Sequence, residues 1–173
     1  MMNWRALNIS ALALAAVLLA GCAGYHLGPV MGETAGDRSV EVLPFNNQTL
    51  QPRLGDALTQ AVRERLQTDG TFHLDTRGTG DIVVSGTITR YGREALSFLN
   101  SDSFTPENYR VGVVVHVVAR ERSSGKLLFE KDLKGFTLIH AGTDLTSADR
   151  QAQPLLAEDL ARNLVSQLAE DRW

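Results

Sequence analysis

The side chains that could perform acid–base, nucleophilic or metal chemistry are scattered along this sequence. Gly78 and Gly80 lack the third glycine and the following helix that a dinucleotide-binding loop needs. No serine stands in the G-x-S-x-G pattern of a nucleophile elbow. The histidines, which are His26, His73, His116 and His140, lack the close spacing of metal ligands. We therefore expect no catalytic residue and no metal site, and the sequence does not indicate an enzyme.

Cys22 is the one cysteine of the chain, and its position suggests covalent modification. It follows a basic start at Arg5 and an apolar segment from Ala11 to Ala20, which is the layout of a secretory signal peptide. The sequence Leu19-Ala20-Gly21-Cys22 resembles a bacterial lipobox, whose cysteine receives diacylglycerol and an N-acyl chain such as palmitate. Two or more acyl chains anchor a protein durably to a membrane. The alternative is an ordinary signal peptide with a chance cysteine near its cleavage site.

The lipobox reading divides the chain into a signal peptide (1–21), a lipidated N-terminus and linker (22–38) and one domain (39–173). Ala23, and not aspartate, follows the cysteine. By resemblance to bacterial lipoprotein sorting, this implies anchoring on the periplasmic side of the outer membrane. The formal net charge of −3 is unlike the strongly basic balance of a nucleic-acid binder, and no nucleic-acid partner is expected.

Basic side chains gather in the second half of the chain, where they could meet phosphate groups. Lysine and arginine are the usual protein partners of phosphate. The alternative is a charged strand end that keeps the protein soluble and prevents edge-to-edge pairing. The candidates for phosphate binding are Arg120, Arg122, Lys126, Lys131 and Lys134.

The first half of the domain predicts a short strand, a helix and a second strand. Residues 39–45 alternate around Val40 and Val42, and Pro44 ends this strand. Residues 51–69 carry an apolar stripe at helical spacing, with Gly70 as the expected C-terminal cap. A brief extended piece is possible at 72–76. Residues 81–91 alternate as a strand.

The second half predicts a loop, a hairpin and a final helix. Residues 92–108 show no periodicity and are expected to form a long loop. Strands at 109–121 and 127–139 are expected to pair across a turn. Thr146 and Asp149 resemble a capping pair for the last helix, with Pro154 as a kink or its true start. The order predicts an α+β fold: one mainly antiparallel or mixed four-stranded sheet with two amphipathic helices packed on one face. Its other face would look outward with Ser85, Thr87, Arg110, His116 and Arg120.

The segment Cys22-Ala23-Gly24-Tyr25-His26-Leu27 resembles the start of the LptE family of lipopolysaccharide-assembly lipoproteins. Members of that family typically have cysteine, glycine, an aromatic residue, a polar residue and leucine, so Ala23 is an extra residue here. The order of the elements that follow is also similar over nearly the whole domain.

The resemblance implies a protein without enzymatic activity. Family members sit inside the β-barrel translocon LptD, help to assemble it and assist delivery of lipopolysaccharide to the outer leaflet. Some members bind lipopolysaccharide through basic residues, so the five basic candidates above become its candidate contacts. The lumen of such a barrel is wet and polar, which suits a sheet with a hydrophilic outer face. No cofactor is implied beyond the lipid on Cys22.

Two other functions remain open. The first is a lipoprotein carrier that holds a lipid in an apolar cavity, although the polar alternation on the outer sheet face argues against it. The second is a structural periplasmic lipoprotein without a role in transport.

Overall fold

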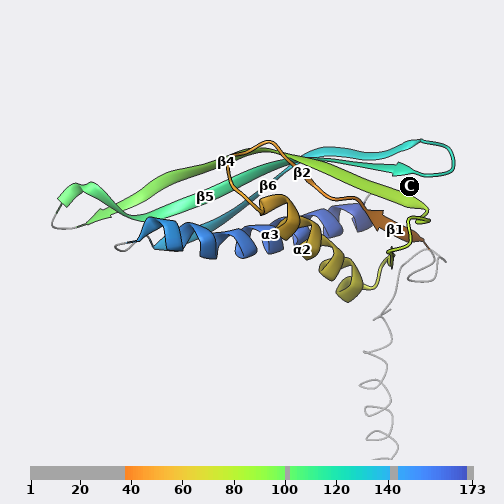
Figure 1. The fold of residues 1–173 in the computed structure, drawn as a ribbon, viewed down its shortest axis with the longest axis horizontal. Helices are drawn as coiled ribbons and strands as arrows, with labels where there is room; N and C mark the ends of the chain where they lie inside the picture. Colours follow the sequence, from red (N-terminus) through yellow and green to blue (C-terminus); the bar gives the residue numbers. More distant parts are fainter. Residues whose placement is uncertain (1–37, 100–101, 141–143, 171–173) are drawn as a thin grey trace, which may run out of the picture. The chain divides into compact units, whose positions relative to one another are not determined.

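The computed structural model describes residues 38–99, 102–140 and 144–170 (Figure 1). Contacts divide the chain into two compact units, Met1–Thr34 and Ala35–Trp173, and all described residues belong to the second. The predicted signal peptide, the lipobox with Cys22 and nearly all of the predicted linker lie outside the described residues.

A mixed sheet forms the centre of the described unit. The strand order is β3-β1-β4-β5-β6, and β2 pairs with β4 outside this path. β1 pairs in parallel with β3 and β4, and β2 pairs in parallel with β4, whereas β5 runs antiparallel to both β4 and β6. The bounds are Ser39–Val42 for β1, Asn46–Asn47 for β2, His73–Asp75 for β3, Ile82–Leu99 for β4, Asp102–Glu121 for β5 and Leu127–His140 for β6.

The prediction of four strands is wrong, because the sheet has six. β2 is a pair of asparagines and carries no alternation that a sequence could reveal, whereas β3 has three residues and lies within the brief extended piece expected at 72–76. Both are strands only because a longer strand supplies their hydrogen-bonding partner: β2 pairs with Thr87 and Ile88 of β4, and β3 pairs with β1. The α+β class is confirmed.

The predicted loop at 92–108 is also wrong, because most of this segment belongs to a long β-hairpin. β4 continues to Leu99 and β5 already begins at Asp102. Register shifts between Ile88 and Arg90 and again between Ala95 and Leu99 break the alternation of side chains. Most side chains of β4 beyond Ile88 are also exposed or only half-buried. Because few positions in this part of β4 are buried, few of them need an apolar residue. The sequence there therefore does not alternate between apolar and polar residues.

Two helices, α2 (Leu54–Asp69) and α3 (Leu145–Glu170), cover the same face of the sheet (Figure 1). Each buries a stripe of leucine, valine and alanine against the sheet and against the other helix. α2 ends as predicted at Gly70, whose φ of 76° suits a residue without a Cβ atom. Among the described residues, neither helix has a stretch apolar and long enough to cross a bilayer.

The predicted cap of α3 is wrong in its residues. The side chain of Asp144 accepts a hydrogen bond from the backbone N–H of Ser147 at 3.1 Å and another from the Ser147 hydroxyl. These bonds hold the pKa of the Asp144 carboxyl below its usual value. Pro154 lies inside α3 and does not mark its start. Asp149 is therefore free for a different role, described below.

Two glycines of the sheet allow large side chains to pack directly on its backbone. A Cβ atom at Gly86 of β4 would lie 2.7 Å from Cδ1 of Phe45, so the buried Phe45 ring rests on the bare backbone. A Cβ atom at Gly135 of β6 would lie 2.7 Å from Cγ of Leu160 on α3. At the next residue, the Phe136 N–H donates a hydrogen bond to the Asp159 carboxylate at 3.3 Å. α3 is thus in contact with β6 at both residues.

Asp75 makes the stability of this unit depend on pH. Its buried carboxylate accepts hydrogen bonds from the backbone N–H groups of Thr79 at 2.6 Å and Arg77 at 3.4 Å. The Thr79 bond lowers the pKa of Asp75 below 3.8, against the opposing effect of burial. A lowered folded-state pKa contributes stability that is present above the unfolded pKa and is lost as pH falls through the folded one.

We therefore expect Asp75→Asn to reduce the loss of stability below about pH 4. The measurement is urea unfolding of the wild type and of Asp75→Asn at several pH values. At neutral pH the variant should be the less stable of the two, and the two curves should converge in acid. Parallel curves over the whole range would show that Asp75 is not involved.

Candidate functional site

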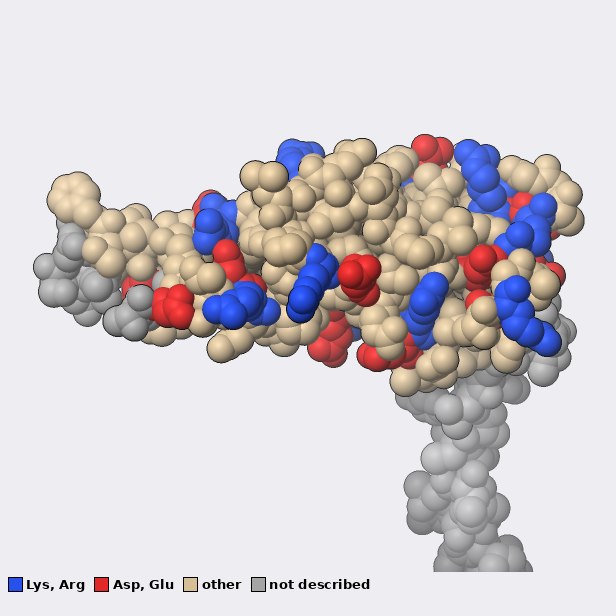
Figure 2. Space-filling view, in the orientation of Figure 1, with Lys and Arg blue, Asp and Glu red and all other residues tan. Residues whose placement is uncertain are grey.

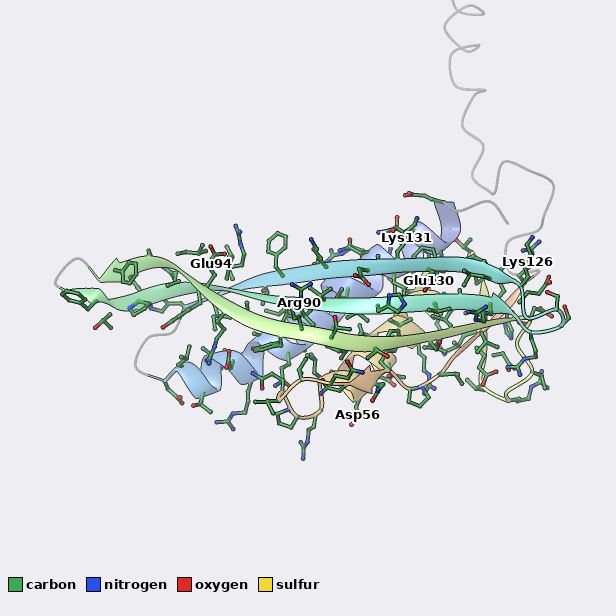
Figure 3. The ribbon with its side chains drawn as sticks, turned by 90° about the horizontal axis from the view of Figure 1, so that it is seen from above. Asp56, Arg90, Glu94, Lys126, Glu130 and Lys131 are labelled. Atoms are coloured by element: carbon green, nitrogen blue, oxygen red, sulfur yellow. The ribbon has the colours of Figure 1, made fainter. Side chains whose placement is uncertain are left out.

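The side of the sheet opposite the helices is uncovered in the described unit, and we call it the open face (Figure 3). Alternate residues of β4, β5 and β6 point to it, while the residues between them enter the core. Its side chains are Val83, Ser85, Thr87, Arg90 and Glu94 from β4, Arg110, Val114, His116, Val118 and Arg120 from β5, and Glu130, Asp132, Lys134, Phe136 and Leu138 from β6.

This arrangement confirms the predicted outer face, including its charged residues. Like many antiparallel sheets, this one packs one face and leaves the other in water. The open face mixes both signs of charge with a smaller number of apolar side chains. It can therefore contact a polar surface over the length of three strands.

The polar side chains nearest the β5–β6 turn have hydrogen-bonding partners within the described unit. The His116 ring lies between two carboxylates, with Nδ1 2.8 Å from Asp132 and Nε2 3.3 Å from Glu130. Arg120 donates a hydrogen bond to the Gly125 carbonyl at 3.3 Å. Among residues 38–99, 102–140 and 144–170, no group of three or more histidine, aspartate, glutamate or cysteine side chains could hold a metal ion.

The structure does not bring the five basic candidates into one cluster. Arg120 and Lys134 lie on the open face, and Lys126 lies beside the β5–β6 turn (Figure 3). Figure 2 shows lysine and arginine side chains spread over the visible face among acidic ones. Arg122 points away from them, donating a hydrogen bond to the Gly80 carbonyl at 2.7 Å and pairing with Glu41 of β1. The Lys131 ammonium lies 4.9 Å from the centroid of the Phe129 ring, on the opposite side of β6.

The far end of the β4–β5 hairpin carries apolar side chains that the sequence did not single out. Phe104 is 90% exposed, and Leu96 and Phe98 are each about half exposed. Exposed apolar residues gathered at one place mark contact sites more often than isolated ones do. They were missed because the segment was predicted to be a loop.

A polar cluster ties this hairpin to α3. Asp149 accepts hydrogen bonds from the Tyr91 hydroxyl at 3.1 Å and from the Arg93 guanidinium at 2.9 Å. Burial raises the pKa of Tyr91 to about 12, and the negative charge of Asp149 adds to this. The Tyr91 hydroxyl therefore remains a hydrogen-bond donor at physiological pH. Asp149, predicted as a helix cap, positions the hairpin instead.

We expect Asp149→Ala to lower the free energy of unfolding by about 2 kcal/mol, because it leaves the partly buried Tyr91 hydroxyl and Arg93 without their acceptor. Hydrogen exchange should also accelerate in residues 90–95. Glu158→Ala, an exposed change on the same helix, is the matched control and should cost less than about 0.5 kcal/mol. Equal losses in the two variants would contradict a special role of Asp149.

Comparison with solved structures identifies this fold in other bacterial proteins. The protein XCC0632 from Xanthomonas campestris is 12% identical, with a TM-score of 0.60 over 84% of this chain and 92% of that one. The protein CT253 from Chlamydia trachomatis is 12% identical, with a TM-score of 0.55 over 78% and 96%. A minor lipoprotein from Acinetobacter baumannii is 12% identical, with a TM-score of 0.52 over 78% and 94%. These similarities establish the fold.

No curated protein matches the sequence. The sequence of residues 38–171, by contrast, matches the family described as LptE, lipopolysaccharide-assembly. The match spans every described helix and strand. It confirms the resemblance seen in the N-terminal residues, which themselves lie outside the matched range. The chain therefore belongs to the LptE family of lipopolysaccharide-assembly proteins.

Proposed function

We propose that this protein is an outer-membrane lipoprotein that occupies the lumen of an LptD-like β-barrel, assists its assembly and helps to deliver lipopolysaccharide to the outer leaflet. It acts without catalysing a reaction. Diacylglycerol and an N-acyl chain on Cys22 anchor it on the periplasmic side. The family match supports the role in lipopolysaccharide assembly, and the partner and location follow from the family resemblance.

The open face is the observation that carries the proposal. Both helices cover the other side of the sheet, so β4, β5 and β6 present a long polar surface with no partner among the described residues (Figure 3). The inner wall of a large β-barrel is polar and hydrated. A surface of mixed charges can pair with such a wall without burying unpaired ions.

The carrier alternative requires an enclosed apolar cavity. One hollow of the described unit is lined by Thr79, Asp81, Ile82, Glu121 and Arg122, and it is open to solvent. Its wall is polar and apolar in similar measure, and this does not suit an acyl chain. The helix side of the sheet is filled by the packed core. The geometry thus favours a surface contact over lipid storage.

Lipopolysaccharide contact remains part of the proposal, with Arg120, Arg122, Lys126, Lys131 and Lys134 as its candidate residues. Arg122 is the weakest of them because its guanidinium already pairs with Glu41. Arg120→Gln combined with Lys126→Gln should weaken binding of purified lipopolysaccharide, while Arg122→Gln should have a smaller effect. If Arg122→Gln caused the larger loss, this ranking would be wrong.

Native purification of the tagged lipoprotein from detergent-solubilised envelopes tests the main proposal. The barrel protein should be recovered with it in a stable complex, and depletion of the lipoprotein should lower surface lipopolysaccharide. Recovery of the lipoprotein alone with bound lipid would favour the carrier. Unchanged surface lipopolysaccharide after depletion would favour a structural role.

Cys22→Ser should abolish incorporation of labelled palmitate.

A further inference from the structure

Two neighbouring cross-strand rows of the open face differ in how their ionisable side chains are partnered. Near the β5–β6 turn, His116 has carboxylate neighbours on β6. Closer to the β4–β5 hairpin, Arg90 and Lys134 lie on either side of Val114 in one cross-strand row. Neither cation makes a hydrogen bond or an ion pair within the described part of the chain. This row therefore presents two positive charges that have no ion-pair partner among the described residues.

The neighbouring rows add exposed apolar surface. Phe136 is 57% exposed and Leu138 is 60% exposed. The Arg110 guanidinium lies 5.4 Å from the centroid of the Phe136 ring, and it also faces Glu94 at 4.0 Å. The ring thus has a cation over its face, which limits its movement at the margin of the sheet. A large side chain that is exposed and also held in place is a suitable wall for a docking surface.

The floor between these side chains is bare backbone. Gly92 and Gly112 face each other, and Phe136 follows Gly112 in the same row. A Cβ atom at Gly92 would meet no atom within 4 Å, and one at Gly112 would meet only the Gly135 carbonyl oxygen at 3.8 Å. The Phe136 ring therefore does not cover them. Glycine inside a strand lowers stability, and no contact within the described unit requires it here.

Resting on the function proposed above, we propose that Arg90, Lys134, Gly92, Gly112 and Phe136 form a docking patch for an acidic segment of the barrel partner. An aromatic side chain of that segment lies flat on the two glycines against Phe136, as aromatic residues cover glycines in sheets. A carboxylate beside it meets Arg90 and Lys134. The charges of the patch favour an anionic occupant, and in this proposal the anion that Lys134 meets is a carboxylate of the partner.

Co-purification of the full-length lipoprotein with its barrel tests this docking patch. Gly112→Val fills the floor, and it should reduce recovery of the barrel by roughly tenfold without lowering the melting temperature of the lipoprotein. Ser166→Val adds similar bulk at an exposed position of α3, outside the open face, and should leave recovery unchanged. Lys134→Gln, which needs no repacking, should lower recovery and make it less sensitive to salt.

A photoreactive phenylalanine analogue at position 136 identifies the occupant. It should crosslink to a segment of the barrel that contains an aromatic residue next to aspartate or glutamate. Crosslinking to lipopolysaccharide would overturn the choice of a protein occupant. Recovery within twofold of wild type for both Gly112→Val and Lys134→Gln would overturn the patch alone. A wild-type lipoprotein that never brings down the barrel would overturn the proposed function as well.

Discussion

Gly86→Val is expected to lower the free energy of unfolding by about 3 kcal/mol. The new Cβ atom would lie 2.7 Å from Cδ1 of the Phe45 ring and 3.0 Å from the His116 carbonyl oxygen. Neither neighbour can move easily. Phe45 is 5% exposed, and its backbone N–H donates a hydrogen bond to the Thr59 hydroxyl at 3.0 Å. The His116 carbonyl belongs to the central strand of the sheet.

Gly92→Val is the matched control, because it makes the same change on the same strand where no atom lies within 4 Å. It should leave stability within about 0.5 kcal/mol of wild type. Thermal unfolding separates the two variants, since about 3 kcal/mol corresponds to a fall in melting temperature of roughly 10 °C in a domain of this size. Similar melting temperatures would mean that the Phe45 contact is not tight in solution.

The Gly135–Leu160 contact gives the second large effect. Gly135→Val should destabilise the protein by about 3 kcal/mol, because its side chain would enter the space filled by Leu160 and push α3 away from β6. Leu160→Ala should cost about 3 kcal/mol by opening a cavity, since Leu160 is 2% exposed. Urea unfolding of each variant measures both losses.

The double variant Gly135→Val with Leu160→Ala tests whether the two changes share one space. The valine would occupy part of the volume that leucine vacates, so the combined loss should be at least about 1 kcal/mol smaller than the sum of the single losses. Gly112→Val with Leu160→Ala is the control pair and should be additive, because Gly112 faces the other side of the sheet. An additive result for the first pair would contradict the proposed contact.

Much of the fold could be predicted because its core obeys regular periods. Val111, Val113, Val115 and Val117 alternate in β5 because one face is fully buried, and the leucines of α3 recur once per turn for the same reason. The short β2 and the outer half of the β4–β5 hairpin could not be predicted. β2 depends on pairing with β4, which is distant in the sequence, and the outer half of the hairpin contains register shifts, so neither leaves a local pattern.

The candidate site was predicted in outline only. Alternation placed Arg110, His116 and Arg120 correctly on the outer face. The five basic residues suggested a phosphate site. Their sequence did not reveal that Arg122 pairs with Glu41 of β1, which is far away in the sequence. It also did not single out Arg90, because the register shift before this residue changes which face it occupies. Charge composition is visible in a sequence, whereas charge pairing depends on the tertiary structure.

The hydrogen bond between the Phe136 N–H and Asp159 also affects how readily two copies of this protein associate through β6. β6 is the last strand of the sheet, and an outermost strand offers its backbone to any other strand it encounters. A carboxylate from α3 occupies one of those donors, and Lys131 and Lys134 place charge along the same strand. Together they discourage edge-to-edge pairing between copies of the chain, and so they lower its tendency to aggregate.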